Sequence, residues 1–180
     1  MKRFVCIVLL VFLVGLGAGC KDKEAQAALA EMKAQAELEA RNIELIKTMI
    51  AELDKGNVEI LLKLYAPDSK YYFPSNSATP MSREDEVVMV KMFYAAMPDL
   101  THKIVDIFAD KDLVITRLTA SGTHQAELEG IPPTGNKVTI SALIIFRVKD
   151  GLVVEEIEEA DMLGLYQQLG MELKPKTPAK

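Results

Sequence analysis

The chain has 180 residues, 49% of them hydrophobic and 26% charged, which is typical of a folded domain rather than a disordered chain. Its formal net charge of −5, with no basic cluster and no tryptophan, argues against binding to nucleic acid. With only two cysteines and two histidines, the composition also argues against a zinc centre built from these ligands.

The first residues, 1–19, have the pattern of a bacterial secretory signal. Two basic residues precede an apolar run over 4–16, which is shorter than the ~20 residues of a membrane-spanning helix. Ala18 and Gly19 precede Cys20, as at a bacterial lipoprotein cleavage site. We therefore expect a lipid on Cys20 that holds the protein on the extracytoplasmic, periplasmic side of the bacterial cell envelope. A non-cleaved anchor and cleavage by the ordinary signal peptidase are the alternatives.

The next segment, 20–41, is rich in helix-forming residues and contains neither glycine nor proline. Apolar positions recur at heptad spacing, weakly at first and strongly from Ile43 onward. We interpret 20–41 as the lipidated cysteine with a helical spacer, and expect the first packed helix of a domain to begin near Asn42. A short two-helix coiled coil is the alternative.

Two further helices, with a short strand between them, are expected before residue 100. That first helix ends at Gly56, a second short helix follows over 58–65, and a short strand over 70–73. Ser82, with Asp85 three residues later, has the spacing of a capping box and predicts the start of a third helix.

From residue 100 onward the pattern is that of strands. We expect strands over 101–109, 113–127, 137–149 and 152–160, a closing helix over 161–171 and a polar tail over 172–180. Gly122 divides the second of these strands or forms a bulge in it. Asp150 and Gly151 predict a hairpin turn. Helices followed by an antiparallel meander indicate an α+β fold, whose curved sheet leaves a hollow suited to a small molecule.

The strand over 137–149 carries large aliphatic side chains on both of its faces. One face can pack on the helices, and the other needs a cover to be kept from water. We therefore expect a homodimer.

Four motifs point to a known family. They are Gly122-Thr123-His124 followed by GIPPTG at 130–135, then Phe146-Arg147 with Asp150-Gly151, and finally DMLGLYQQLG at 161–170. In their order and spacing, residues 42–171 resemble the SnoaL-like polyketide cyclases and bacterial ester cyclases of the nuclear transport factor 2-like superfamily. The resemblance implies a cone, in which a curved antiparallel sheet wraps over N-terminal helices.

The resemblance also implies a chemistry, which is intramolecular aldol ring closure with a carboxylate as acid and base. The carboxylate position falls on Glu158, and a family histidine falls on His124. A further family histidine falls on Ile144, and no amide stands at 71–73 where the family has an asparagine.

The residues themselves support several candidate roles. Glu156 and Glu158 share one face of their strand by its period of two, and a carboxylate held in an apolar cavity can become a usable acid or base. A solvated acidic strand is the alternative. His124 ends an apolar stripe, so it lines a pocket or anchors a loop. Asp161 fits a helix cap, with a pocket role second, and His102 is expected to be structural or exposed.

Phosphate-binding glycine loops, GxSxG and HExxH are absent from the sequence, so we expect neither a cofactor nor a metal. The leading hypothesis is a lipoprotein that binds a small apolar or carbonyl-bearing molecule in the cone. Whether it is a cyclase or isomerase using Glu158 with His124, or a binding module without chemistry, is left open by the sequence. A non-catalytic envelope scaffold, using the N-terminal helix and a dimeric cone, is the alternative from another class.

Overall fold

The computed structural model describes residues 3–175, with side chains from residue 23. Cys20 and the whole expected signal, 1–19, therefore lie outside the residues whose side chains are described. The chain forms two compact units, residues 1–38 and residues 39–180. In the first, residues 23–38 belong to helix α1 (Arg3–Leu53) and are almost all exposed, Leu29 and Met32 included. No helix in the described part of the chain has an apolar stretch long enough to cross a membrane.

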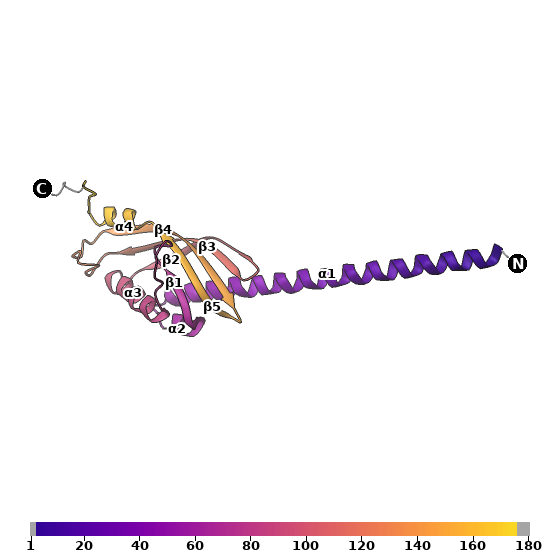
Figure 1. Ribbon diagram of the computed structural model, residues 1–180. Coiled ribbons are helices and arrows are strands. Elements are labelled where there is room, and N and C mark those ends of the chain that lie inside the picture. The colour runs from indigo at the N-terminus through magenta and orange to yellow at the C-terminus, as the bar shows by residue number, and fades with distance from the viewer. Residues whose placement is uncertain (1–2, 176–180) are drawn as a thin grey trace. The chain divides into compact units, whose positions relative to one another are not determined.

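The second unit is a curved five-stranded sheet packed on helices, which confirms the α+β prediction. Its elements, shown in Figure 1, are the end of α1, α2 (Ile60–Leu64), β1 (Tyr65–Tyr72), α3 (Arg83–Ala96), β2 (Thr101–Asp110), β3 (Leu113–Thr123), β4 (Lys137–Lys149), β5 (Leu152–Ala160) and α4 (Met162–Gln168). The strand order is β1-β5-β4-β3-β2, in which β1 runs parallel to β5 and the other pairs are antiparallel.

The main core lies between the inner face of the sheet and the helices. Helix α1 contributes Ile46, Met49 and Ile50, all buried, so the second half of the heptad pattern is the part that packs. The inner face of the sheet contributes alternate residues, among them Val114 and Phe146, which are completely buried. A second cluster, around Leu128 and Leu165, packs α4 and the loop after β3 against the end of the sheet.

Several local predictions are confirmed. Ser82 caps α3 by accepting a hydrogen bond from the backbone N–H of Asp85, whose side chain accepts in return from the Ser82 backbone. The turn between β4 and β5 has positive φ at Asp150 and Gly151, as a tight hairpin requires. Arg147 pairs with Glu155 on the neighbouring strand at 3.2 Å.

Two predicted boundaries are wrong. The second helix is shorter than predicted, because Tyr65 already begins β1, which continues past Pro67 through a shift in its register with β5. The strand predicted to reach residue 127 ends at Thr123, and its pairing with β4 is regular through Gly122. Gly122 is instead a point of close approach: a β-carbon there would lie 3.0 Å from Cβ of Met97.

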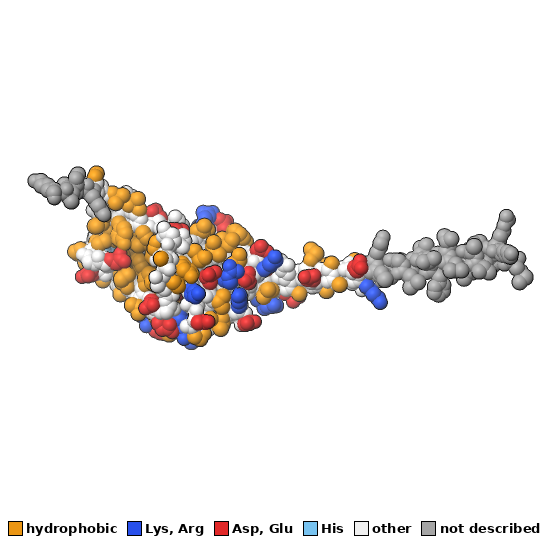
Figure 2. All heavy atoms as spheres, in the orientation of Figure 1, with side chains coloured by type: hydrophobic (Ala, Val, Ile, Leu, Met, Phe, Trp, Pro, Cys, Tyr) orange, Lys and Arg blue, Asp and Glu red, His pale blue; other side chains and the backbone are white. Residues whose placement is uncertain are grey.

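On the face shown in Figure 2, acidic and basic side chains of the domain are interspersed with hydrophobic ones. The outer face of the sheet carries a row of directly paired apolar residues that crosses four strands: Phe108, Ile115, Ile145 and Ile157. Phe108 and the nearby Leu143 are 55% and 47% exposed.

Candidate functional site

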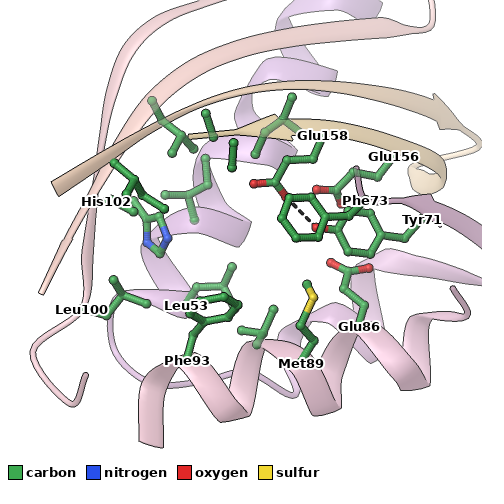
Figure 3. Close-up of a pocket in the computed structure, with 18 of the residues that line it drawn as sticks. Leu53, Tyr71, Phe73, Glu86, Met89, Phe93, Leu100, His102, Glu156 and Glu158 are labelled. Carbon is green, nitrogen blue, oxygen red and sulfur yellow. Dashed lines mark hydrogen bonds between the residues drawn. The ribbon is translucent and has the colours of Figure 1, made fainter. Parts of the chain in front are cut away.

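A pocket of about 140 Å³ lies between the inner face of the sheet and the helices (Figure 3). Its walls come from α1, α3 and all five strands, and most of them are apolar. The polar side chains that line it are Tyr65, Tyr71, Glu86, Tyr94, His102, Glu156 and Glu158. A cavity of this order holds a benzene-sized molecule, so a small, largely apolar ligand fits it.

Three carboxyl groups converge at one end of the pocket, as Figure 3 shows. Glu156 and Glu158 come from β5, where alternation places both on the inner face. Glu86 comes from α3, facing them from the helix layer. Glu86 and Glu156 are each only 4% exposed, and Glu158 is half-buried. The prediction that Glu156 and Glu158 share one face of β5 is confirmed, and that face is the inward one.

Two tyrosines of β1 hold the carboxyl groups of β5. The hydroxyl of Tyr65 donates to Oε2 of Glu156, and the hydroxyl of Tyr71 donates to Oε2 of Glu158 at 2.6 Å. The parallel pairing of β1 with β5 brings these side chains together. The ring of Tyr71 stacks on Phe73, with centroids 6.1 Å apart, which fixes its direction.

Burial makes these carboxyl groups hard to ionise. It is the main cause that raises the pKa of Glu86 to about 8, and the charge of Glu158 adds to it. Burial, followed by the charges of Glu86 and Glu158, raises the pKa of Glu156 well above its ordinary value. Burial also raises the pKa of Glu158, against the lowering effect of the Tyr71 hydrogen bond. At neutral pH the cluster therefore retains protons that it can donate.

His102 lines the other side of the pocket (Figure 3), where its imidazole ring is paired with Asp54. His102, the second residue of β2, contacts Asp54, which directly follows α1: the distance from Nδ1 to Oδ1 is 2.7 Å. The backbone N–H of His102 donates to the same oxygen at 2.9 Å. An ionised carboxylate only accepts hydrogen bonds, so beside an ionised Asp54 the Nδ1 atom is the donor, and in the neutral imidazole the lone pair lies on Nε2. The pair can therefore act as a base.

Tyr94 adds a polar group to the lining. Its hydroxyl is buried and has no hydrogen-bond partner among the described residues. Burial and the charge of Asp54 raise its pKa. This hydroxyl is free to bond a ligand.

His124 lies elsewhere, in contrast to the expectation that it works with Glu158. It is completely buried and does not line the pocket. Its Nδ1 accepts from the backbone N–H of Thr134 at 3.2 Å, and its own backbone bonds to Asn136 and Gly135. This side chain thus anchors the 130–136 loop: β3 lines the pocket through Leu118 and Ala120, and His124 comes after the strand has ended at Thr123.

Asp161 also lies outside the pocket lining. Its side chain is exposed and accepts from the backbone N–H of Gly164 at 2.8 Å, so it caps α4. The described part of the chain contains no group of three or more His, Cys, Asp or Glu side chains arranged to hold a metal ion.

Sequence reasoning missed several polar residues of the site. Glu86 could have been found, because it lies three, four and seven residues before Met89, Val90 and Phe93 on the inner face of α3. Tyr71 and His102 carried no such signal: their partners Glu158 and Asp54 lie 87 and 48 positions away in the chain.

Comparison with known proteins supports the same fold. AclR of Streptomyces galilaeus, a candidate hydroxylase, is 31% identical and has a TM-score of 0.68, covering 73% of this chain and 97% of its own. IdmH of Streptomyces antibioticus, a candidate polyketide cyclase, is 32% identical with a TM-score of 0.64, covering 72% and 99%. A SnoaL-like protein of Jannaschia sp. CCS1 is 20% identical and shares the fold, with a TM-score of 0.67 over 76% and 96%. A search of curated proteins found no match.

The family model of the SnoaL-like polyketide cyclases matches residues 44–169. Those residues include every element of the domain from the end of α1 to α4, and all the side chains that line the pocket. The chain therefore belongs to the SnoaL-like polyketide cyclase family.

Proposed function

We propose that this protein binds a small, mostly apolar, carbonyl-bearing molecule and catalyses a cofactor-independent cyclisation or isomerisation of it by proton transfer. One observation carries the proposal: a single apolar pocket holds carboxyl groups that retain protons on one side and a histidine–aspartate pair on the other. A reaction that moves a proton from carbon to oxygen needs a base and an acid on opposite sides of the substrate.

The two sides of the pocket have complementary roles in this reaction. Nε2 of His102 takes a proton from the carbon next to the substrate carbonyl, and Asp54 stabilises the imidazolium that forms. The electron pair released from the C–H bond forms the enolate, and in a cyclisation it then forms a carbon–carbon bond to a second carbonyl carbon. The alkoxide produced takes a proton from Glu158. Return of a proton from His102 to Glu158 through solvent restores the starting state, so no oxidant or reductant is consumed.

Tyr71 is a positioning residue in this account. Its hydroxyl donates to Oε2 of Glu158, and its ring stacks on Phe73. The hydrogen bond favours the ionised form of Glu158, so it offsets part of the effect of burial and brings the acid closer to a usable range. The names of AclR and IdmH, a candidate hydroxylase and a candidate polyketide cyclase, support small-molecule chemistry in this fold.

The test compares product formation by wild type and two isosteric variants on a ligand recovered from the protein as purified from its own cells. We expect Glu158→Gln and His102→Asn each to lower turnover by roughly 10²–10⁴, the usual effect of a positioned acid or base, while binding is nearly kept. His124→Asn is the matched control, because His124 anchors a loop outside the pocket. Equal turnover in wild type and Glu158→Gln would remove Glu158 from the mechanism.

We further propose that the protein acts at the bacterial cell envelope, anchored by a lipid on Cys20. The sequence supports this through the apolar run over 4–16 and the small residues before Cys20. The exposed helix of residues 23–38 would then be a spacer between the lipid and the domain.

A further inference from the structure

The acidic end of the pocket contains an oxygen atom with no partner. Oε2 of Glu86 is buried, and no described residue forms a hydrogen bond with it. The side chain is only 4% exposed and is directed into the pocket (Figure 3). Buried polar atoms nearly always have a hydrogen-bond partner, so this oxygen is a place where a ligand atom is expected.

No cationic side chain of the described lining offsets the ionised form of the carboxyl groups at this end. Three carboxyl groups line the pocket, and among its described lining residues there is no lysine or arginine. Arg83, one turn before Glu86 on α3, is engaged elsewhere: its Nη1 donates to the backbone carbonyls of Leu62 and Tyr65, at 3.1 and 3.2 Å. The hydroxyls of Tyr65 and Tyr71 donate hydrogen bonds to Glu156 and Glu158, but these donors are neutral and bring no positive charge.

We propose that the pocket takes a ligand with a protonated amine, which binds Glu86 at the acidic end, attached to a small apolar skeleton. The proposal rests on the small-molecule role proposed above and narrows its substrate class to carbonyl compounds that also carry a basic amine. An ammonium group brings N–H donors for Oε2 of Glu86, and its positive charge favours the ionised form of Glu86, which releases its proton to solvent on binding. A neutral hydroxyl brings one donor and no charge.

The rest of the pocket suits the apolar part of such a ligand. Phe73 and Met89 line the wall beside the carboxyl groups, Phe93 lies nearer His102 (Figure 3), and a benzene-sized ring matches a cavity of about 140 Å³. An aromatic face next to an ammonium group adds a further attraction. In this arrangement Glu86 selects the substrate, and Glu158 is left to transfer the proton.

A protonated Glu86 would give the opposite ligand preference. If Glu86 stays protonated and donates to an oxygen of the ligand, a neutral alcohol or ketone binds at least as well as an amine. Benzylamine and benzyl alcohol differ at this one group, and benzylamine is protonated at pH 7. Their affinities for the same protein therefore separate the two arrangements without any substitution.

The experiment is an NMR titration of the full chain with benzylamine and with benzyl alcohol at pH 7, repeated on Glu86→Gln. A hydrogen bond to a charged group corresponds to roughly a tenfold or larger change in affinity, so we expect benzylamine to bind at least about tenfold more tightly than benzyl alcohol. That preference is lost in Glu86→Gln. It is kept in Glu127→Gln, a matched control that removes one exposed carboxylate outside the pocket.

Equal or weaker binding of benzylamine in wild type, or an amine preference that survives in Glu86→Gln, would overturn the proposal. Both results concern binding alone. They are distinct from failure of the proposed reaction, which appears as equal turnover in wild type and Glu158→Gln.

Discussion

Replacing Glu86 by glutamine should stabilise the protein at neutral pH and leave its stability near pH 5 almost unchanged. Burial and the charge of Glu158 raise the pKa of Glu86 from its ordinary value of 4.5 to about 8. Between these two values the folded protein holds a proton that the unfolded chain releases. The free energy of unfolding therefore falls as the pH rises through this window, and it is constant below it.

The magnitude follows from the same two values. Each pH unit inside the window lowers the free energy of unfolding by roughly 1 kcal/mol, so raising the pH from 5 to 7 gives a loss of roughly 2–3 kcal/mol attributable to Glu86. Glutamine keeps the shape of the side chain and does not ionise, so the free energy of unfolding of Glu86→Gln does not fall by this amount. Because Glu86 interacts with Glu156 and Glu158, the titration belongs to the cluster and is spread across the window.

The assay uses protein lacking residues 1–20. Its unfolding by urea is monitored by circular dichroism at pH 5 and at pH 7. Wild type and the control Glu127→Gln should lose stability between the two pH values, and Glu86→Gln should lose roughly 2–3 kcal/mol less than they do. The reasoning is refuted if Glu86→Gln and wild type lose the same amount.

Three other substitutions test separate parts of the account. Asp54→Asn should lower turnover by roughly 10²–10⁴, because an amide does not stabilise the His102 imidazolium, and unchanged turnover would exclude the pair from the reaction. Cys20→Ser should move the protein from the membrane to the soluble fraction in cell fractionation, and a processed mutant that stays with the membrane would contradict the lipid anchor. Protein lacking residues 1–20 should be a homodimer by light scattering at micromolar concentration, and Leu143→Glu, on the exposed apolar face of the sheet, should make it a monomer. A monomeric wild type would contradict the dimer.

Much of the fold could be predicted because its signals are local. The Ser82–Asp85 capping box, the Asp150-Gly151 turn and the alternation along β4 each depend on residues a few positions apart. The alternation along β5 likewise puts Glu156 and Glu158 on one face of the sheet, which is the inner face. Boundaries were less predictable, because the start of β1 depends on pairing with β5, a strand nearly ninety positions later.

The partners within the site could not be predicted, because they meet only through the tertiary fold. His102 meets Asp54 because β2 is the edge strand that lies over the end of α1, and no spacing in the sequence records that contact. His124 was drawn into the predicted site by a family motif and by the apolar stripe it ends. Its strand stops one residue earlier, so its ring turns to the loop instead.

The central claim is that the pocket inside the cone holds a small molecule. Native mass spectrometry of protein purified from its own cells tests it most directly, when wild type is compared with Ala142→Phe, which fills the cavity, and with Ala95→Phe on the exposed side of α3. The account predicts one added mass on wild type and on Ala95→Phe that is absent from folded Ala142→Phe. The same added mass on all three proteins would contradict it.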